Sequence, residues 1–281
     1  MTDQESSKPA QKPKPRFRWK VLIIPPLLVC GGYLALLYFT QHSIIFPTEF
    51  VDGDPEAFPR QADAERLVLE QKSQKVPAYY FPSKDADTCI LIAHGNAELA
   101  QNWFDQAEDL VAGGFSVLIV EYPGYGKADG SPSQKSIARF MDTGYDHLLR
   151  IGYKPDKLVG LGSSVGAGVI CDLSTRKKLA ALVLISPFRS LKEMAWKHYA
   201  PPFLVRSPFD NEAALRQFQG PVLIFHGKDD EIIPFGHSEH LASLDESFTL
   251  IPLVSGHNDI HLFWQREMIG RISGFFREAI K

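Results

Sequence analysis

The sequence predicts an α/β fold built on a mostly parallel, doubly wound sheet, and three observations support this prediction. Apolar runs of strand length alternate with longer segments of helical composition along most of the chain. One of these runs, residues 158–161, leads directly into Gly162-Ser163-Ser164-Val165-Gly166 and then into a helical segment. The part after the N-terminal apolar segment has about 240 residues, which suits one undivided domain. Alternating strands and helices are typical of a parallel sheet with helices on both faces.

The chain begins with a segment that predicts one transmembrane helix. Residues 21–39 carry no charge and are largely apolar, and about nineteen such residues are enough to cross a bilayer. Residues 1–20 are rich in lysine, proline, serine and glutamine, a composition typical of disorder. We therefore expect a basic disordered tail at 1–20, a signal-anchor helix at 21–39 and a globular domain at 40–281.

The charges on either side of this helix predict its orientation. Basic residues precede it, at Lys8, Lys12, Lys14, Arg16, Arg18 and Lys20. Acidic residues follow it, at Glu49, Asp52, Asp54 and Glu56. The positive-inside rule then places the N-terminus in the cytoplasm and the domain outside it, in the periplasm of a Gram-negative cell. A cleaved signal peptide is the alternative, but the apolar stretch continues to Phe39 and no small-x-small cleavage site follows it.

Within residues 40–281 the expected elements follow one another in order. Two short runs, residues 67–70 and 78–81, predict an antiparallel hairpin that leads into the sheet. Further strands are expected at residues 88–93, 158–161, up to 185, 221–225 and 248–253. Helices are expected at residues 97–113, 133–150, 165–176, 235–244 and 263–280. Residues 187–220 contain aromatic residues and three prolines, and they predict either a short cap over the site or a plain crossover connection.

The pentapeptide from Gly162 to Gly166 predicts a nucleophile elbow, a sharp turn from strand to helix whose central residue is strained and exposed. Ser164 stands at the apex and is the candidate nucleophile, whereas Ser163 lies off the apex and is expected to pack. Glycine suits the two outer positions because a Cβ there would collide with the neighbouring strand or helix. Alone, such a pentapeptide is weak evidence, since glycine and serine are common in loops.

A serine nucleophile needs a histidine base, and the histidine needs a carboxylate that orients it. The loop after the predicted strand 221–225 holds three acidic residues. We assign the acid to Asp230, because it lies a few residues past the strand and is followed by apolar residues and a proline. Asp229 and Glu231 are then expected to be solvated loop charges. His257 lies in the loop after the last predicted strand and is the candidate base.

An oxyanion hole requires two backbone N–H groups that point at the developing alkoxide. Val165, the residue after the candidate nucleophile, is expected to supply the first. The second should come from the loop after the strand at residues 88–93, from either Asn96 or Ala97, of which we prefer Asn96. His94 begins the same loop and is expected to shape it.

Together these motifs resemble those of the α/β-hydrolase domain proteins. The matching segments are His94-Gly95-Asn96-Ala97, Tyr122-Pro123-Gly124-Tyr125-Gly126, Gly130-Ser131-Pro132, the elbow, Phe209-Asp210-Asn211, His226-Gly227 with Asp230, and Gly256-His257-Asn258-Asp259. The resemblance covers about residues 41–279. It implies the α/β-hydrolase fold with a short cap, and a triad of Ser164, Asp230 and His257.

More narrowly, the chain resembles a single-pass, membrane-anchored branch that has many uncharacterised bacterial members. That branch is similar to the serine aminopeptidase-like proteins and is related to eukaryotic serine hydrolases that remove palmitate from proteins. The sequence departs from many relatives at Ala97-Glu98-Leu99, where they have a glycine after the Asn-Ala pair. We expect an acidic Glu98 near the site to affect substrate preference more than the hydrolytic reaction itself.

Composition narrows the remaining function classes. The formal net charge of −3 gives no reason to expect a nucleic-acid partner. Cys30, Cys89 and Cys171 fall in an apolar segment, a strand and a helix, so no disulfide framework is expected. The sequence has no metal-ligand spacing, phosphate loop or dinucleotide fingerprint, and we expect no metal or cofactor. The oligomeric state stays open.

We therefore expect a membrane-anchored serine hydrolase that cleaves carboxylic esters or thioesters through an acyl-enzyme. Its partners would be an acyl substrate and the membrane. A peptidase is one alternative, but aminopeptidase relatives usually need a large cap with acidic residues, and the cap here is short. A catalytically silent interaction domain is the other, and an intact triad argues against it. Only residues 40–47 separate helix from domain, which would keep the site within about a domain's width of the lipid.

Overall fold

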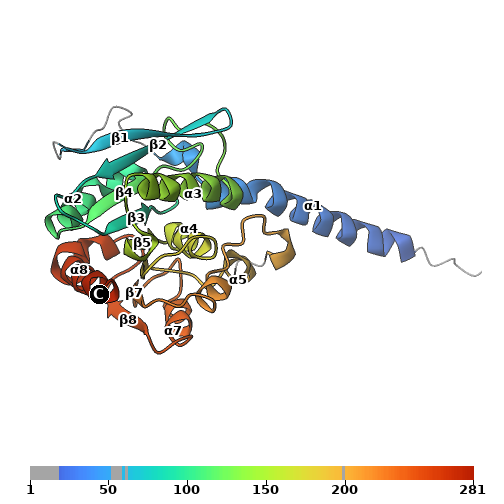
Figure 1. The fold of residues 1–281 in the computed structure, drawn as a ribbon. Coiled ribbons are helices and arrows are strands. Elements are labelled where there is room, and N and C mark those ends of the chain that lie inside the picture. The colour runs from blue at the N-terminus through green and yellow to red at the C-terminus, as the bar shows by residue number, and fades with distance from the viewer. Residues whose placement is uncertain (1–18, 52–58, 61–62, 198–199) are drawn as a thin grey trace, which may run out of the picture.

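A sheet of eight strands forms the centre of the domain in the computed structural model, which describes residues 19–51, 59–60, 63–197 and 200–281 (Figure 1). The strands are β1 (Glu65–Gln71), β2 (Gln74–Phe81), β3 (Cys89–Ala93), β4 (Ser116–Val120), β5 (Leu158–Ser163), β6 (Leu182–Ile185), β7 (Val222–Gly227) and β8 (Phe248–Leu253). Their order is β1-β2-β4-β3-β5-β6-β7-β8. The pairs β1–β2 and β2–β4 are antiparallel, and the other pairs are parallel.

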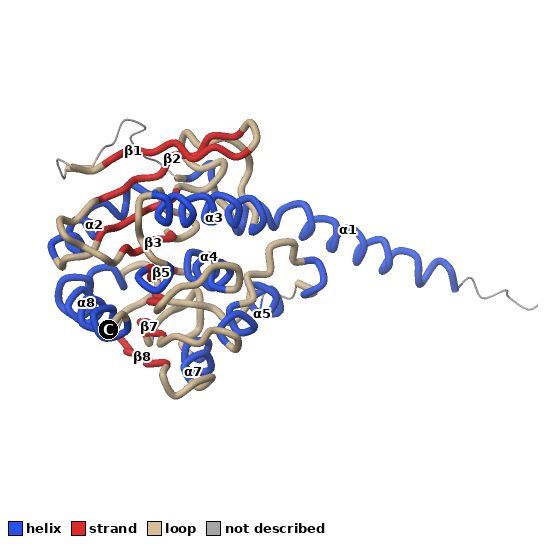
Figure 2. The backbone as a smooth tube through the Cα atoms, viewed as in Figure 1, coloured by secondary structure: helices blue, strands red, loops and turns tan. Residues whose placement is uncertain are grey.

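Helices cover both faces of this sheet (Figure 2). They are α1 (Trp19–Ile45), α2 (Phe104–Ala112), α3 (Gln134–Arg150), α4 (Val165–Ser174), α5 (Leu191–Lys197), α6 (Asn211–Leu215), α7 (Gly236–Ala242) and α8 (Ile269–Ala279). Side chains alternate between faces along a strand. In β4, Leu118 and Val120 join a core that includes α3 and α4, whereas Val117 and Ile119 join a second core that includes α2 and α8. This arrangement confirms the predicted doubly wound sheet.

Several local expectations are refined by the structure. The hairpin at the start of the sheet is present, and its register joins Leu67 to Ala78. The strand β4 was not among those expected. The C-terminal helix was expected from residue 263, but a 3-10 turn (Ile260–Phe263) and a π-helical turn (Trp264–Met268) precede α8. The buried indole of Trp264 donates a hydrogen bond of 2.9 Å to Asp109, which ties this irregular start to α2.

The N-terminal helix α1 extends away from the domain (Figure 1). Its segment Ile23–Ile45 is long and apolar enough to cross a membrane, and none of its most apolar stretch is buried inside the protein. The helix ends at Ile45, six residues beyond the expected end at Phe39. Of the tail expected at residues 1–20, the first eighteen lie outside the described residues, and α1 begins at the next one.

The last turns of α1 contact the domain, which explains why the helix continues past residue 39. Gln41 donates a hydrogen bond of 3.0 Å to the carbonyl oxygen of Leu204, and the ring Nε2 of His42 lies 3.0 Å from that of Pro132. Phe46, immediately after the helix, is buried at 2% exposure. The segment expected to be a linker is therefore helical and packed against the domain.

The helix α4 approaches the end of β3 so closely that only glycine fits at the contact. A Cβ on Gly166 would lie 2.0 Å from the carbonyl oxygen of Ala93. A Cβ on Gly162 would lie 2.3 Å from the carbonyl oxygen of Gly166. Both distances are far inside van der Waals contact, so these glycines are required by close backbone packing, as the sequence predicted.

A buried ion pair joins the ends of β3 and β4. The His94 ring donates from Nε2 to Glu121 over 2.8 Å, and its Nδ1 lies 2.8 Å from the carbonyl oxygen of Gly95. The second Glu121 oxygen accepts the backbone N–H of Ala100, and the His94 ring stacks on Tyr122. Because both ring nitrogens face acceptors, a protonated imidazole satisfies both. This network supports the expected structural role of His94.

The environment of His94 raises its pKa above the ordinary value. Burial favours the neutral ring and would lower the pKa, but the Glu121 charge, the hydrogen bond to Glu121 and the Gly95 carbonyl together outweigh it. The folded protein therefore holds this proton more tightly than the unfolded chain. The resulting stability is fully present below the unfolded pKa of about 6.5 and is lost as pH rises through the raised folded pKa.

We expect Gly166→Ala to destabilise the protein by about 3 kcal/mol, the upper range for overpacking, because the backbone of Ala93 must move. Gly270→Ala in α8 is the matched control, since no atom lies within 4 Å of the added methyl group. There alanine should be neutral or slightly stabilising. Thermal unfolding of the full chain in detergent, followed by near-UV circular dichroism, measures both. Equal losses would contradict the steric argument.

We expect the melting temperature of the wild type to fall as pH rises from about 6 to 9, through the raised pKa of His94. Glu121→Gln keeps a carbonyl acceptor but removes the charge. This variant should be less stable at pH 6 and should lose less stability over the same pH range. Parallel slopes for the two proteins would show that the pair does not carry the pH dependence.

Candidate active site

Ser164 stands at the turn between β5 and α4, with its backbone in a strained conformation. Its φ of 52° and ψ of −115° lie in a region that residues with a Cβ rarely adopt. The Ser164 N–H donates a hydrogen bond of 2.8 Å to the carbonyl oxygen of Ile185 in β6, which holds the turn. Ser163 is the last residue of β5 and, unlike Ser164, does not line the cavity described below. The side chain at the apex faces the cavity described below.

The structure brings the three residues of the expected triad together. His257, in the loop after β8, has its Nε2 3.2 Å from the Oγ of Ser164. Its Nδ1 lies 2.7 Å from Oδ2 of Asp230, in the loop after β7. In this arrangement Nδ1–H donates to the carboxylate and Nε2 accepts the serine proton. The order along the chain is Ser, Asp, His, as the sequence predicted.

Asp230 is buried, whereas its neighbours Asp229 and Glu231 are exposed. Burial alone would raise the pKa of Asp230, but hydrogen bonds from His226 and His257, the electrostatic contribution of the His257 ring and the backbone N–H of Ile233 hold that pKa well below its usual range. The carboxylate therefore remains charged when the solution is mildly acidic. Of the three acidic residues in this loop, Asp230 alone reaches His257 within the described part of the chain.

His226 is a residue whose part in the site was missed by sequence reasoning. Its Nε2 lies 2.9 Å from the carbonyl oxygen of Ile233. The same nitrogen also lies 3.2 Å from Oδ2 of Asp230, and Nδ1 lies 2.6 Å from the hydroxyl of Ser238. Asp230 thus sits between two imidazole rings. The signal in the sequence was the short spacing between His226 and Asp230 across one loop.

Two backbone N–H groups are available beside the serine. Asn96 and Val165 line the same cavity as Ser164, whereas Ala97 is exposed. Among the residues that the structure describes, no hydrogen bond occupies the N–H of Asn96 or Val165. The peptide that carries the Asn96 N–H has its Gly95 carbonyl oxygen 2.8 Å from Nδ1 of His94. The hydroxyl of Tyr125 donates a hydrogen bond of 2.7 Å to the carbonyl oxygen of the next peptide, that of Asn96. Asn96 and Val165 therefore border the cavity beside Ser164, and the oxyanion hole stays a prediction.

The carboxylate of Glu98 is used within its own loop. One oxygen accepts the backbone N–H of Gly95 at 2.7 Å and the indole N–H of Trp103 at 2.8 Å. These bonds turn the side chain back onto the loop, and Glu98 does not line the cavity. The acidic residue that departs from the pattern of many relatives therefore supports the loop in place of a glycine turn.

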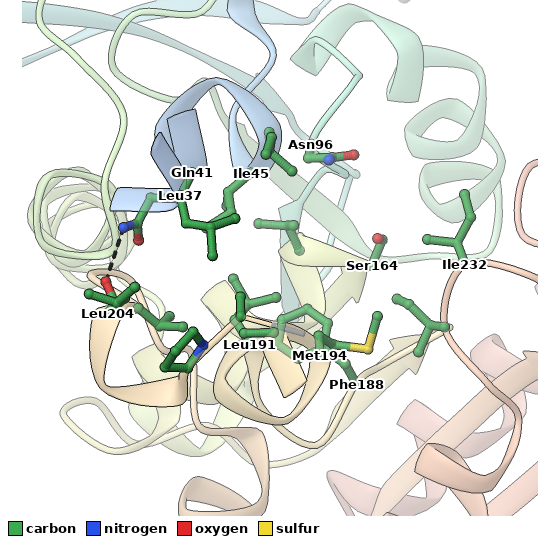
Figure 3. A pocket seen from close by; sticks show the side chains of 17 residues that line it. Leu37, Gln41, Ile45, Asn96, Ser164, Phe188, Leu191, Met194, Leu204 and Ile232 are labelled. Atoms are coloured by element: carbon green, nitrogen blue, oxygen red, sulfur yellow. Dashed lines mark hydrogen bonds between the residues drawn. The ribbon is translucent and has the colours of Figure 1, made fainter. Parts of the chain in front are cut away.

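An apolar cavity of about 390 Å³ opens beside Ser164 (Figure 3). Its walls come from five places: the last turns of α1, the loop after β3, the turn between β5 and α4, the segment at residues 187–220, and the loop after β7. They are Leu37, Gln41, Ile44, Ile45, Asn96, Ser164, Val165, Phe188, Leu191, Met194, Ala195, Ala200, Pro201, Leu204, Val205, Ile232 and Ile233. Eight of these residues come from the segment 187–220, so its described part borders the cavity, which favours a cap over a plain crossover connection.

Comparison with known proteins agrees with this architecture. A protein-family model described as serine aminopeptidase, S33, matches residues 84–208. An uncharacterized protein of Mycobacterium tuberculosis is 31% identical over 263 residues, which cover 90% of this chain and 92% of that protein. Alpha/beta hydrolase domain-containing protein 17B of Xenopus tropicalis is 30% identical over 192 residues, 65% of each chain.

Solved structures share the fold at lower identity. An esterase of Pyrococcus furiosus superposes with a TM-score of 0.65 at 18% identity, covering 82% of this chain and 96% of that one. An alpha-beta hydrolase of Vibrio vulnificus superposes with a TM-score of 0.64 at 20% identity, covering 76% of this chain and 81% of that one. With the strand order, the elbow and the sequence relatives, these likenesses lead to one conclusion. The chain belongs to the α/β-hydrolase superfamily.

Proposed function

We propose that the protein is a membrane-anchored serine hydrolase that cleaves carboxylic ester or thioester bonds through an acyl-enzyme. The observation that carries the proposal is the continuous set of contacts from Ser164 through His257 to Asp230 at the side of an apolar cavity. A group of residues with only a structural role would not require a strained serine whose hydroxyl lies against both a histidine and a cavity.

Each group has a defined role in the proposed reaction. Ser164 Oγ attacks the acyl carbonyl while its proton moves to Nε2 of His257, and the alkoxide that forms accepts N–H bonds from Val165 and Asn96. His257 then gives the proton to the leaving alcohol or thiol, and an acyl-enzyme remains. Water, deprotonated by His257, releases the acid and restores Ser164. Asp230 holds the histidine tautomer and stabilises its positive charge throughout.

The cavity favours an acyl group over a peptide. A substrate amine would require an acidic partner, yet within the described residues no Asp or Glu lines the cavity. The polar side chains on its walls are Gln41, Asn96 and Ser164. An apolar pocket with few polar groups near the nucleophile suits an alkyl chain whose carbonyl lies at Ser164. This supports esters and thioesters over the aminopeptidase alternative.

The helix α1 supports the anchor. Large apolar side chains such as Leu28, Val29 and Phe39 are more than two-thirds exposed, and burying them in lipid removes this surface from water. A signal sequence of the same composition is the alternative, but the contacts of Gln41 and His42 with the domain favour a helix that stays. The basic residues before α1 support a cytoplasmic N-terminus.

We expect a fluorophosphonate probe to label the wild type and Ser163→Ala but not Ser164→Ala. Ester hydrolysis should follow the same order, because only the residue at the apex contacts both His257 and the cavity. Gel fluorescence and a p-nitrophenyl butyrate assay measure the two. Labelling of Ser164→Ala at the wild-type rate would reject the proposed nucleophile and, with it, the acyl-enzyme.

We expect Asp230→Asn to slow turnover by about 10⁴, since an amide in this position favours the wrong histidine tautomer. Asp229→Asn is the matched control, because Asp229 is the exposed neighbour in the same loop. It should retain most of the activity. Initial rates on p-nitrophenyl butyrate compare the variants, and a larger loss in Asp229→Asn would move the acid to that residue.

A further inference from the structure

The end of α1 is part of the wall of the active-site cavity. Leu37, Gln41, Ile44 and Ile45 line the same cavity as Ser164. All four belong to the segment Ile23–Ile45, which is long and apolar enough to cross a membrane. The helix expected only to hold the protein at the membrane therefore also shapes the space next to the nucleophile.

Gln41 joins this helix to the cap through both ends of its amide. Its Nε2 donates to the carbonyl oxygen of Leu204 at 3.0 Å, and its Oε1 accepts the backbone N–H of Arg206 at 2.9 Å. The guanidinium of Arg206 lies 5.4 Å from the ring centre of Tyr38, one turn earlier in α1. These contacts hold the helix and the cap segment as one wall.

The cavity has two distinct ends (Figure 3). Ser164 and Ile232 lie at one end, and Leu37, Gln41 and Leu204 lie at the other, with Leu191 and Met194 between them. An acyl chain whose carbonyl is at Ser164 therefore extends toward α1. A volume of about 390 Å³ is near the lower limit for ligand pockets, which fits one alkyl chain better than a whole diacyl lipid.

We propose that α1 is a specificity-determining wall of an acyl-chain site, and that this site takes a long acyl chain directly from the bilayer that α1 enters. Leu37 faces the cavity, while its neighbour Leu36 is 59% exposed on the outer side of the same helix. One turn of α1 thus contacts both the acyl site and the lipid. A chain that moves along α1 leaves the bilayer without crossing water. The inference rests on the proposed ester or thioester hydrolysis.

The first test compares two tryptophan variants of the full-length protein in detergent. Leu37→Trp fills the far end of the cavity and should lower the ratio of kcat/KM for p-nitrophenyl palmitate to that for p-nitrophenyl butyrate by about tenfold. Leu36→Trp adds the same bulk on the outer face and should leave that ratio at the wild-type value. An equal ratio in both variants would overturn the proposal.

The second test separates this inference from the proposed chemistry. A fluorescent long-chain fatty acid is titrated into Ser164→Ala, alone and combined with each tryptophan substitution. Leu37→Trp should weaken binding about tenfold, and Leu36→Trp should not change it. If this shift occurs but the wild type hydrolyses no ester, the acyl site stands and the proposed function fails. If the wild type hydrolyses esters but Leu37→Trp does not weaken fatty-acid binding, the acyl site on α1 is rejected and the proposed function stands.

The third test identifies the source of the chain. The full-length wild type is reconstituted in phosphatidylcholine vesicles, and a fluorogenic long-chain ester is placed either in the same vesicles or in separate ones. Delivery from the bilayer predicts faster hydrolysis in the same vesicles, by about tenfold or more, because the local substrate concentration is higher. Equal rates would show that the chain arrives through water and would overturn entry along α1.

Discussion

The close approach of α4 to the end of β3 is the constraint on which the site depends. Gly166 packs against the carbonyl oxygen of Ala93, and Gly162 packs against the carbonyl oxygen of Gly166. The turn between these two glycines therefore has no room to relax. Ser164 is therefore held at a positive φ that it would not adopt alone. The same contact brings the loop after β3 beside the N-terminus of α4, so Asn96 and Val165 border one cavity with Ser164. Backbone packing thus positions three groups at once.

Buried charge in this protein is balanced by hydrogen bonds at two places. Asp230 lies between His226 and His257 and accepts the N–H groups of Ile232 and Ile233, which stabilise its ionised form despite burial. At the other place, His94 and Glu121 form a hydrogen bond with each other at the start of the loop after β3. The two networks have different consequences. The first keeps the carboxylate beside His257 charged, and the second is expected to make the stability of the protein depend on pH.

The helix α1 lies in two environments along its length. Its N-terminal part makes no close packing with the domain, and its large apolar side chains are exposed. Its last turns bind the cap through Gln41 and contribute to the cavity. A helix that is apolar all round is usually buried or in a membrane. The last turns of α1 pack against the domain, and the proposal above places the rest of the helix in a membrane, so that it links anchoring to substrate selection.

Most of the strands and helices, though not β4, and also the elbow and the candidates Ser164, Asp230 and His257, could be predicted from the sequence, because each depends on local pattern. Apolar runs identify strands, two glycines identify a tight turn, and the acid and the base each follow a strand in the expected order. Other features needed the tertiary structure. Three such features are the contact of His226 with Asp230, the hydrogen bond from the Gly95 N–H to Glu98, and the place of Leu37 in the cavity wall. Each depends on side-chain directions that no local pattern encodes. Leu37 and Ser164 lie far apart in the sequence but line the same cavity. The tertiary fold decides this, because it determines which surfaces face each other.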